Sequence, residues 1–382
     1  MQRNTLITLL SALALSQAIV AAPATIPIGV VVGGDASKIA GDALNHALNR
    51  SHVYSVKFGP VGGISRIEAM TDSGFLTGKL ISADGKVVFE REYNRGDQKL
   101  NAYQLADDVT FKMTGRPGIA TSQIAFVGQR GSSTLIMVTD FDGSNVRDIP
   151  TGLSVAASPA LNSNGSRLSY FGANGSSGSL ISHDLPSGRK KTVLRKSISR
   201  ASAAWSPNGQ YIAAIVAPAE NRMAGSLYLI KAQGGGTPRT LSAGPIEPTS
   251  PGFSPDSARI IFARASGPTS STLYIGSIAS NHFNPTPVPL PVPHASSPNW
   301  SPDGDKIAFV STLNGLKSVC VYSFKANRVD KLGPGNNPVW GADSRHIVYT
   351  TGPELRMLDT FSNQSLVLIG GRGRISEPSW TR

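Results

Sequence analysis

Short apolar runs alternate with polar turns through the last two thirds of the chain. Five of the runs are rich in β-branched and aromatic residues: Arg167–Phe171, Tyr211–Val216, Ile260–Ala263, Ile307–Val310 and Ile347–Tyr349. Runs of this length and composition indicate buried strands. Asn-Gly or Asp-Gly precedes three of them, and these pairs close tight hairpins because they accept positive φ. The pattern therefore predicts a succession of antiparallel strands.

The strands belong to a repeat. One copy reads Ser-Pro-Asn-Trp-Ser-Pro-Asp-Gly-Asp-Lys-Ile-Ala-Phe-Val from Ser297, and related copies begin at Ser158, Ser202, Ser250 and Asn337. The bulky anchors of the copies are Leu161, Trp205, Phe253, Trp300, Trp340 and Trp380, at separations of 44, 48, 47, 40 and 40 residues. This period is that of a propeller blade of four strands.

The C-terminal end of the repeat region supplies the strand that the first copy lacks. The first copy starts at Ile124-Ala125-Phe126-Val127 without an anchor, while the fragment Glu377-Pro378-Ser379-Trp380 stands alone at the other end. A propeller closes when one blade takes strands from both ends, because closure removes a free sheet edge. We therefore expect a mainly β fold in which residues 119–382 form a six-bladed, WD40-like β-propeller closed by the C-terminal strand.

Residues 23–118 lack the repeat and predict a small α/β domain. Ile28–Val32 reads as a strand, after which Asp35 or Ser37 is expected to cap an amphipathic helix. Asp84-Gly85 lies between two apolar runs and predicts a hairpin. A second helix is expected from about Asp97 to Thr114, with Gly115 as its stop.

The first residues predict export. Residues 1–22 read as a secretory signal peptide: Arg3 precedes an apolar stretch from Leu6 to Leu15, and small residues allow cleavage after Ala18, Ala21 or Ala22. No later segment reaches the roughly 20 apolar residues of a membrane-spanning helix. We therefore expect a monomeric periplasmic protein.

The net charge limits the expected partners, and the cysteine content limits the possible disulfides. The formal net charge is +12, which favours acidic or anionic partners. The basic residues are scattered without interleaved aromatics, so nucleic acid is not an expected partner. The single cysteine, Cys320, has no intramolecular partner and is expected to be a small core residue of a strand.

No enzyme chemistry is predicted. The six histidines show no metal-ligand spacing, and no Gly-x-Ser-x-Gly nucleophile elbow is present. The run from Asp140 to Asn145 resembles the start of a calcium loop, but Thr151 stands where the loop needs Glu. We therefore expect no catalytic residues, no metal and no cofactor.

The domain order and the blade motif together resemble the TolB family of the Tol-Pal system. The blade motif Pro-x-Trp-Ser-Pro-Asp-Gly-x-x-Ile-Ala-Phe is shared with other propellers. The domain order together with the junction, a helix that ends at Thr114-Gly115 followed by Ile124–Val127, is more specific. The turn Asp140–Gly143 is similar to the first-blade turn of the family. The resemblance covers nearly all of the chain after the signal. Leu161 in place of an aromatic anchor and Gly341-Ala342 in place of Ser-Pro depart from it.

The resemblance implies a non-enzymatic adaptor. Its members bind the peptidoglycan-associated lipoprotein Pal through the propeller face and the inner-membrane protein TolA through a flexible N-terminal segment. They support outer-membrane integrity and constriction at cell division. This chain has fewer residues between its predicted cleavage sites and Ile26 than the family usually has.

The loops that precede the anchors are the expected partner-binding surface, because a propeller binds at its channel mouth. The candidates are Arg200, Glu247, His294, Asn336 and Arg374. The alternative for each candidate is that it is a solvated loop side chain without a role in binding. Two other functions stay open: a divergent propeller that binds a different envelope partner or ligand, and a propeller enzyme in which Glu247, Glu377 and His294 converge on a metal.

Overall fold

The computed structural model describes residues 24–94, 96–130, 133–175, 177–218, 225–234, 236–246, 251–267, 270–279, 282–313, 315–371 and 373–381. The predicted signal peptide lies outside these residues. Among the residues described, no helix is both long and apolar enough to cross a membrane.

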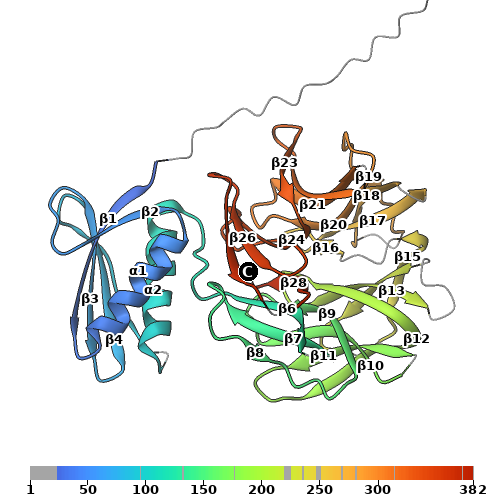
Figure 1. The fold of residues 1–382 in the computed structure, drawn as a ribbon, viewed down its shortest axis with the longest axis horizontal. Helices are drawn as coiled ribbons and strands as arrows, with labels where there is room; N and C mark the ends of the chain where they lie inside the picture. Colours follow the sequence, from blue (N-terminus) through green and yellow to red (C-terminus); the bar gives the residue numbers. More distant parts are fainter. Residues whose placement is uncertain are drawn as a thin grey trace, which may run out of the picture.

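A five-stranded sheet with two helices on one face forms the N-terminal part (Figure 1). The strand order is β2-β1-β3-β4-β5, with β1 parallel to both of its neighbours. The elements are β1 (Ile26–Gly34), α1 (Ser37–Arg50), β2 (Tyr54–Phe58), β3 (Ser65–Asp72), β4 (Phe75–Ile81), β5 (Val87–Tyr93) and α2 (Gln98–Thr114). The hairpin at Asp84-Gly85 is confirmed as the β4–β5 connection. Strands β2 and β3 were not predicted.

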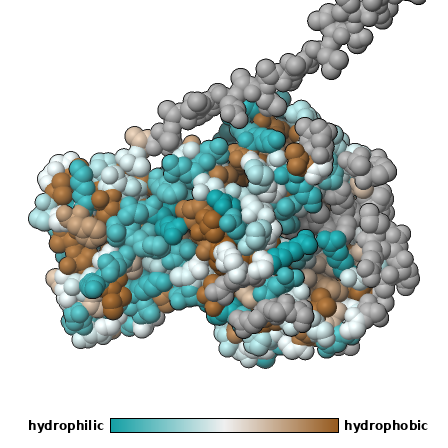
Figure 2. All heavy atoms as spheres, viewed as in Figure 1, coloured by the Kyte–Doolittle hydropathy of each residue, from teal (hydrophilic) through white to brown (hydrophobic). Residues whose placement is uncertain are grey.

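The helices bury only one face of this sheet. In β3, Ile67, Ala69 and Thr71 are buried while Met70 is 56% exposed. Apolar side chains accordingly reach the surface at this end of the molecule (Figure 2), among them Phe58, Met70, Phe75, Val87 and Val88. One packed face and one solvated face is the usual arrangement of a sheet with antiparallel strands.

The two helix starts differ in their capping. Asp97 caps α2, since its carboxylate accepts hydrogen bonds from the N–H groups of Lys99 and Leu100. The predicted cap of α1 by Asp35 or Ser37 is wrong. Its N-cap is Ala36, whose N–H donates to Thr71 Oγ1. The neighbouring strand β3 supplies this acceptor, while the Asp35 carboxylate accepts from the N–H of Ser73.

The remaining strands follow one another in antiparallel sets of four. The sets are β28 (Ser376–Trp380), β6 (Gln123–Arg130), β7 (Ser133–Asp140) and β8 (Arg147–Asp148); β9 (Val155–Leu161), β10 (Arg167–Ala173), β11 (Gly178–Asp184) and the first half of β12 (Lys190–Trp205); the second half of β12, β13 (Tyr211–Pro218), β14 (Gly225–Lys231) and β15 (Arg239–Ile246); β16 (Gly252–Phe253), β17 (Arg259–Gly267), β18 (Ser270–Ser277) and β19 (Thr286–Pro287); β20 (Ala295–Trp300), β21 (Lys306–Leu313), β22 (Leu316–Ser323) and β23 (Arg328–Pro334); and β24 (Asn336–Trp340), β25 (His346–Thr350), β26 (Leu355–Asp359) and β27 (Gln364–Ile369). Figure 1 shows the sets arranged around a common centre.

The anchors and turns of the repeat take the predicted places. All six bulky anchors are at most 8% exposed, and Cys320 is buried in β22. The turn glycines Gly165, Gly209 and Gly304 have positive φ. Ser257 and Ser344 replace glycine at this turn position and still have φ near 60°. The turn geometry is therefore retained where its usual residue is lost.

The last strand completes the first set. Strand β28 pairs antiparallel with β6, so Ser379 lies opposite Ala125 and Trp380 opposite Ile124. Trp380 is 3% exposed, and its indole N–H donates to Ser122 Oγ at 2.7 Å. The C-terminal strand therefore covers an edge that β6 would otherwise present to solvent.

The two helices of the N-terminal part pack against the strand sets. A single apolar cluster runs from Leu44 and Tyr103 of the helices to Phe141, Val348 and Met357. The segment after α2 is tied back to that helix. Asp107 accepts hydrogen bonds from the N–H groups of Ala120 and Thr121 and from the Thr121 hydroxyl. A Cβ on Gly118 would lie 2.0 Å from Asp107 Oδ1, so this approach requires glycine.

Removing the Trp380 side chain tests the closure. We expect Trp380→Ala to lower the free energy of unfolding by about 3–5 kcal/mol, because a large buried side chain leaves a cavity at the closing strand. The measurement is denaturant unfolding. Val367→Ala, at a side chain that is 43% exposed in β27, serves as the control and should change stability by less than about 0.5 kcal/mol. Equal unfolding midpoints for Trp380→Ala and the wild type would contradict the closure.

The Asp107 carboxyl gives a pH dependence. Burial raises its pKa to about 6, although the donors from Thr121 and Ala120 oppose the shift. A folded-state pKa above the unfolded value of about 3.9 means that the folded state holds the proton more tightly. Stability from this group is therefore complete below about pH 4 and is lost as the pH rises through 6.

Unfolding free energies measured from pH 4 to 7 test this dependence. The wild type should lose roughly 1–3 kcal/mol relative to Asp107→Asn over that range. The constant cost of the substitution cancels when only the slopes are compared. Parallel slopes for the two proteins would show that Asp107 does not titrate there.

Candidate functional site

The innermost strand of most sets contains a bulge at a proline. Ser158, Ser297, Asn337 and Glu377 have φ between 49° and 55°, and a proline follows each of them. The pairing register shifts at each of these places. Proline causes the shift because it has no N–H to donate to the strand ladder. In β12, Ala203 stands at the proline position, and Ser202–Trp205 pairs with β13 without a shift.

The innermost strands of the sets surround a small cavity of about 90 Å³. Residues of β9, β12, β16, β20, β24 and β28 all line it, so it lies where the inner strands converge. Its polar lining includes Ser297, Asn299, Asn337 and Glu377. We call this cavity and its entrance at the starts of the inner strands the channel.

Side chains rather than backbone pairs join neighbouring inner strands. Asn299 Oδ1 accepts a hydrogen bond from the N–H of Trp340, and Ser379 Oγ accepts one from the N–H of Leu161. Glu377 Oε2 accepts one from the N–H of Ser158 at 2.7 Å. The wall of the channel thus satisfies N–H groups that the sheets leave unpaired.

Two of the predicted partner-binding residues are exposed cations. Arg200 lies on β12 opposite Ala217, and Arg374 lies in the loop before β28, where its N–H donates to Gln129 Oε1. Each stands three residues before a residue that lines the cavity. Neither lines the cavity itself; Arg200 lies on a strand that does, and Arg374 lies just before one.

The other predicted residues are less exposed or lie outside the described residues. His294 precedes β20, and its Nδ1 is 2.8 Å from Ser271 Oγ. Asn336 is the first residue of β24 and lies opposite Thr350. Neither lines the cavity. Glu247 falls outside the described residues. A role of these residues in binding a partner remains a prediction.

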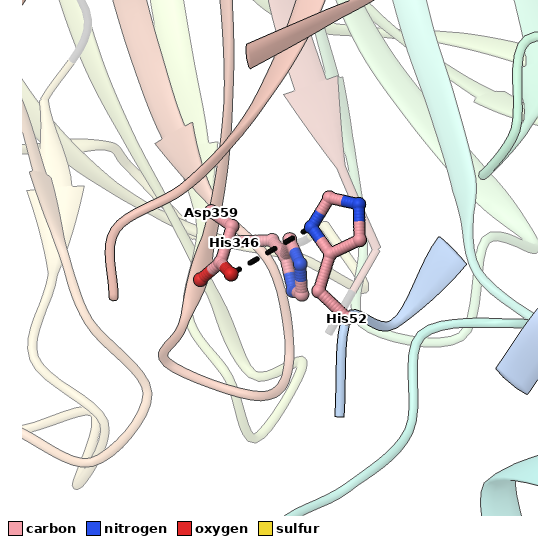
Figure 3. A group of neighbouring side chains, drawn as sticks. All are labelled: His52, His346 and Asp359. Atoms are coloured by element: carbon pink, nitrogen blue, oxygen red, sulfur yellow. Dashed lines mark ion pairs between the residues drawn. The ribbon is translucent and has the colours of Figure 1, made fainter. Parts of the chain in front are cut away.

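A second polar site lies where the N-terminal part meets the turns of the last strand set. His52, from the turn after α1, faces His346 and Asp359 (Figure 3). His52 Nδ1 is 3.6 Å from Asp359 Oδ2, and the two imidazole rings are 5.8 Å apart. His346 and Asp359 are buried, while the His52 side chain is 26% exposed.

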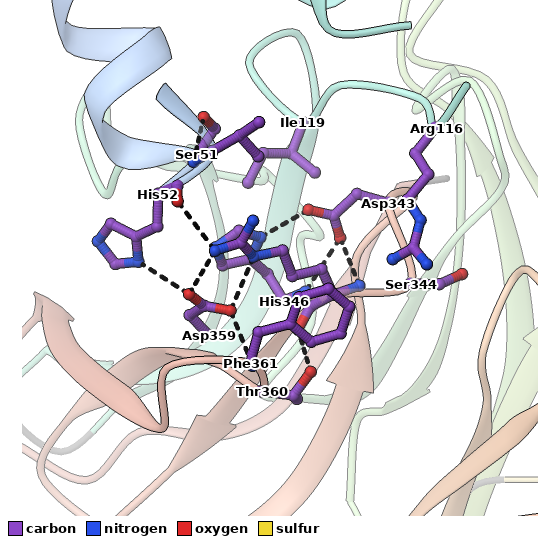
Figure 4. A network of polar contacts seen from close by, with 12 residues as sticks. Ser51, His52, Arg116, Ile119, Asp343, Ser344, His346, Asp359, Thr360 and Phe361 are labelled. Carbon is purple, nitrogen blue, oxygen red and sulfur yellow. Dashed lines mark hydrogen bonds and ion pairs between the residues drawn. The ribbon is translucent and has the colours of Figure 1, made fainter. Parts of the chain in front are cut away.

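Hydrogen bonds hold these groups from both sides (Figure 4). The Arg345 guanidinium donates to both oxygens of Asp359 and also to the carbonyl of His52. His346 Nδ1 lies 2.6 Å from Asp343 Oδ2. One arginine therefore links the N-terminal part to the turns in a bidentate geometry, which is the strong form of such a pair.

The carboxylates of this interface are held ionised. Burial alone would raise the pKa of Asp359, but hydrogen bonds from Arg345 and Ser362, together with the nearby His52 imidazole, outweigh it and hold that pKa well below its usual range. At Asp142, burial is likewise outweighed by His46, whose Nε2 is 2.9 Å away, and by Ser144. The interface therefore contains buried, ionised carboxylates.

No sequence pattern pointed to this second site. His52 and His346 are separated by 294 residues, and neither stands at a spacing typical of metal ligands. Only the packing of α1 against the last strand set brings them together. The bulges, in contrast, have a sequence signal in the proline that stands two residues before every anchor except Trp205.

Residues 111–382 match the protein family described as "TolB beta propeller domain". A TolB homolog from Chlorobium chlorochromatii is 30% identical over 185 residues, which are 48% of this chain and 41% of that protein. A Tol-Pal system protein TolB from Bordetella pertussis is 27% identical over 169 residues, 44% of this chain and 38% of that protein. The matched stretches span about two fifths of these curated relatives.

A solved structure has the same fold. The crystal structure of TolB from Acinetobacter baumannii superposes with a TM-score of 0.79 at 17% sequence identity. The superposition covers 94% of this chain and 97% of that one. The fold of nearly the whole chain, including the propeller predicted from the repeat, is therefore supported.

Glu377 tests the wall of the channel. We expect Glu377→Ala to lower the free energy of unfolding by about 1–3 kcal/mol, because it leaves the Ser158 N–H without its acceptor. Glu377→Gln keeps an acceptor oxygen of the same reach and should cost less. Thermal and denaturant unfolding measure both. An equal loss for the two variants would show that the hydrogen bond is not what Glu377 contributes.

Proposed function

The chain belongs to the TolB family, and on that premise we propose that it is a non-enzymatic periplasmic adaptor of the Tol-Pal system. In this proposal it binds the lipoprotein Pal at the entrance of its channel and thereby supports outer-membrane integrity and constriction during division. The observation that carries the proposal is the channel itself. All six inner strands contribute to it, and polar groups line it at a proline bulge that recurs from set to set.

The proposal includes a division of the chain into parts. Residues 1–22 are the signal peptide, residues 23–118 the N-terminal α/β domain, and residues 119–382 a six-bladed propeller closed by its last strand. The sets of four strands and the β28–β6 pair support this division. A contact with TolA would fall to the segment before Ile26, most of which lies outside the described residues.

The small size of the cavity and the arginines near it support a protein partner rather than a small substrate. The cavity of about 90 Å³ is below the usual size of a small-molecule site. Arg200 and Arg374, which we assign to its entrance, are exposed. Arginine is over-represented at the centre of protein interfaces, where it pairs with carboxylates and stacks on aromatic rings. The entrance therefore suits a protein loop with acidic or aromatic residues.

Calorimetric titration with the periplasmic domain of Pal from the same organism tests the proposal. We expect a one-to-one complex, at least tenfold weaker for Arg200→Glu and weaker for His294→Ala. Lys231→Glu reverses the charge of an exposed side chain at the other end of a blade, opposite Tyr211, and should leave the affinity unchanged. A complex unaffected by the entrance variants would contradict the channel as the binding site.

Absence of binding at high micromolar concentrations would rule out Pal as the partner. The divergence of the blades would then favour the alternative, a propeller of the same lineage that binds a different envelope partner. Leu161 and Ala203 mark this divergence at the channel, where an aromatic anchor and a proline are lost.

A further inference from the structure

We propose that the second polar site is a binding site for a divalent transition metal of the zinc class, with His52, His346 and Asp359 as its protein ligands. One ring nitrogen of each histidine and a carboxylate oxygen of Asp359 all lie within 4.8 Å of one another (Figure 3). Zinc sites with an open position use three protein ligands drawn from histidine and carboxylate, with water as the fourth. The proposal does not depend on binding of Pal.

His346 is prepared as a ligand. Its Nδ1 is engaged with Asp343 Oδ2 at 2.6 Å, and its Nε2 is buried without a hydrogen-bond partner among the described residues. A carboxylate that holds one ring nitrogen fixes the tautomer and raises the basicity of the other, as is typical of metal-binding histidines. A buried imidazole nitrogen without a partner carries a desolvation cost that a metal ion would remove.

His52 follows the end of α1 in a fixed backbone conformation. Its φ is 52°, the left-handed conformation that commonly ends a helix. Its carbonyl is fixed by Arg345, and its Nδ1 is also buried without a hydrogen-bond partner, with Asp359 3.6 Å away. The fixed backbone keeps this imidazole beside the other two ligands.

Asp359 can serve as the third ligand after a small change. Its two oxygens accept from Arg345, from the N–H of Phe361 and from the Ser362 hydroxyl, which together occupy its acceptor positions. The Ser362 hydroxyl is the donor that can rotate away to free Oδ2. Asp343 and Asp359 each contribute a carboxylate to the site, beside the guanidinium of Arg345.

An entry path reaches the site from solvent. An open cleft of about 500 Å³ lies beside His52, lined by residues of α1 and by Leu366 of β27. The His52 side chain is 26% exposed, so a hydrated ion can reach it without unfolding of the interface. A bound ion would join a ligand of the N-terminal part to two ligands of the last strand set, and would stabilise their contact.

Titration of the whole chain without residues 1–22 tests the site. After treatment with a chelator, Zn²⁺ is added in a calorimeter, and Co²⁺ is used as a probe by its visible absorption. We expect one Zn²⁺ per chain with micromolar or tighter affinity, an intense tetrahedral Co²⁺ spectrum, and a higher unfolding temperature with zinc.

Three variants separate this site from other histidines. His52→Ala, at the most exposed ligand, should weaken Zn²⁺ at least 100-fold and abolish the Co²⁺ spectrum. Ser362→Ala should bind zinc at least as tightly as the wild type. His46→Ala removes the other histidine–carboxylate pair of the interface, His46–Asp142, and should leave zinc affinity unchanged. No stoichiometric binding, or equal affinity of His52→Ala and the wild type, would overturn the proposal.

Discussion

The pairing of the last strand with the first strand of the repeat is the constraint on which the rest of the molecule depends. Strand β28 brings Trp380 against Ile124 and covers the edge of β6. It also supplies Glu377 and Ser379, whose side chains accept hydrogen bonds from the next inner strand, β9. Without this strand, one set would have an open edge, and the channel would lose one wall.

The channel follows from a conflict between proline and the strand ladder. A proline in each of four inner strands shifts the register, and the residue before it takes a positive φ. Where Ala203 replaces the proline, the strand is regular. The bulges direct polar groups toward the centre, where side chains such as Asn299 satisfy backbone groups of the neighbouring set. The proline bulges of the repeat thus also produce the polar lining of the channel.

The repeat made most of the fold predictable. The anchors, the turn glycines and the orphan Trp380 each follow from a local pattern with a known period. The unpredicted features depend on contacts between distant segments. Thr71 rather than Asp35 or Ser37 serves the start of α1 because β3 lies beside it, and β3 itself was not recognised. His52 and His346 meet only because α1 packs on the last strand set.

The candidate residues at the channel entrance could be predicted only by their position in the repeat. Arg200 and Arg374 stand three residues before the cavity lining, as their offset from the anchors implies. Their partner cannot be read from this position, because the loops before the anchors differ from set to set. The interface between the N-terminal part and the turns uses buried charges such as Arg345 and Asp359 instead. The interface joins the N-terminal part to the strand sets, whereas the channel entrance is open to solvent.

Hydrogen exchange of the backbone with and without the periplasmic domain of Pal tests the central claim most directly. The account predicts that Pal slows exchange at the starts of the inner strands, at residues 199–204, 294–299, 336–340 and 374–379. It predicts no change in the sheet of the N-terminal part. Protection confined to that sheet, or no protection anywhere, would contradict a partner bound at the channel.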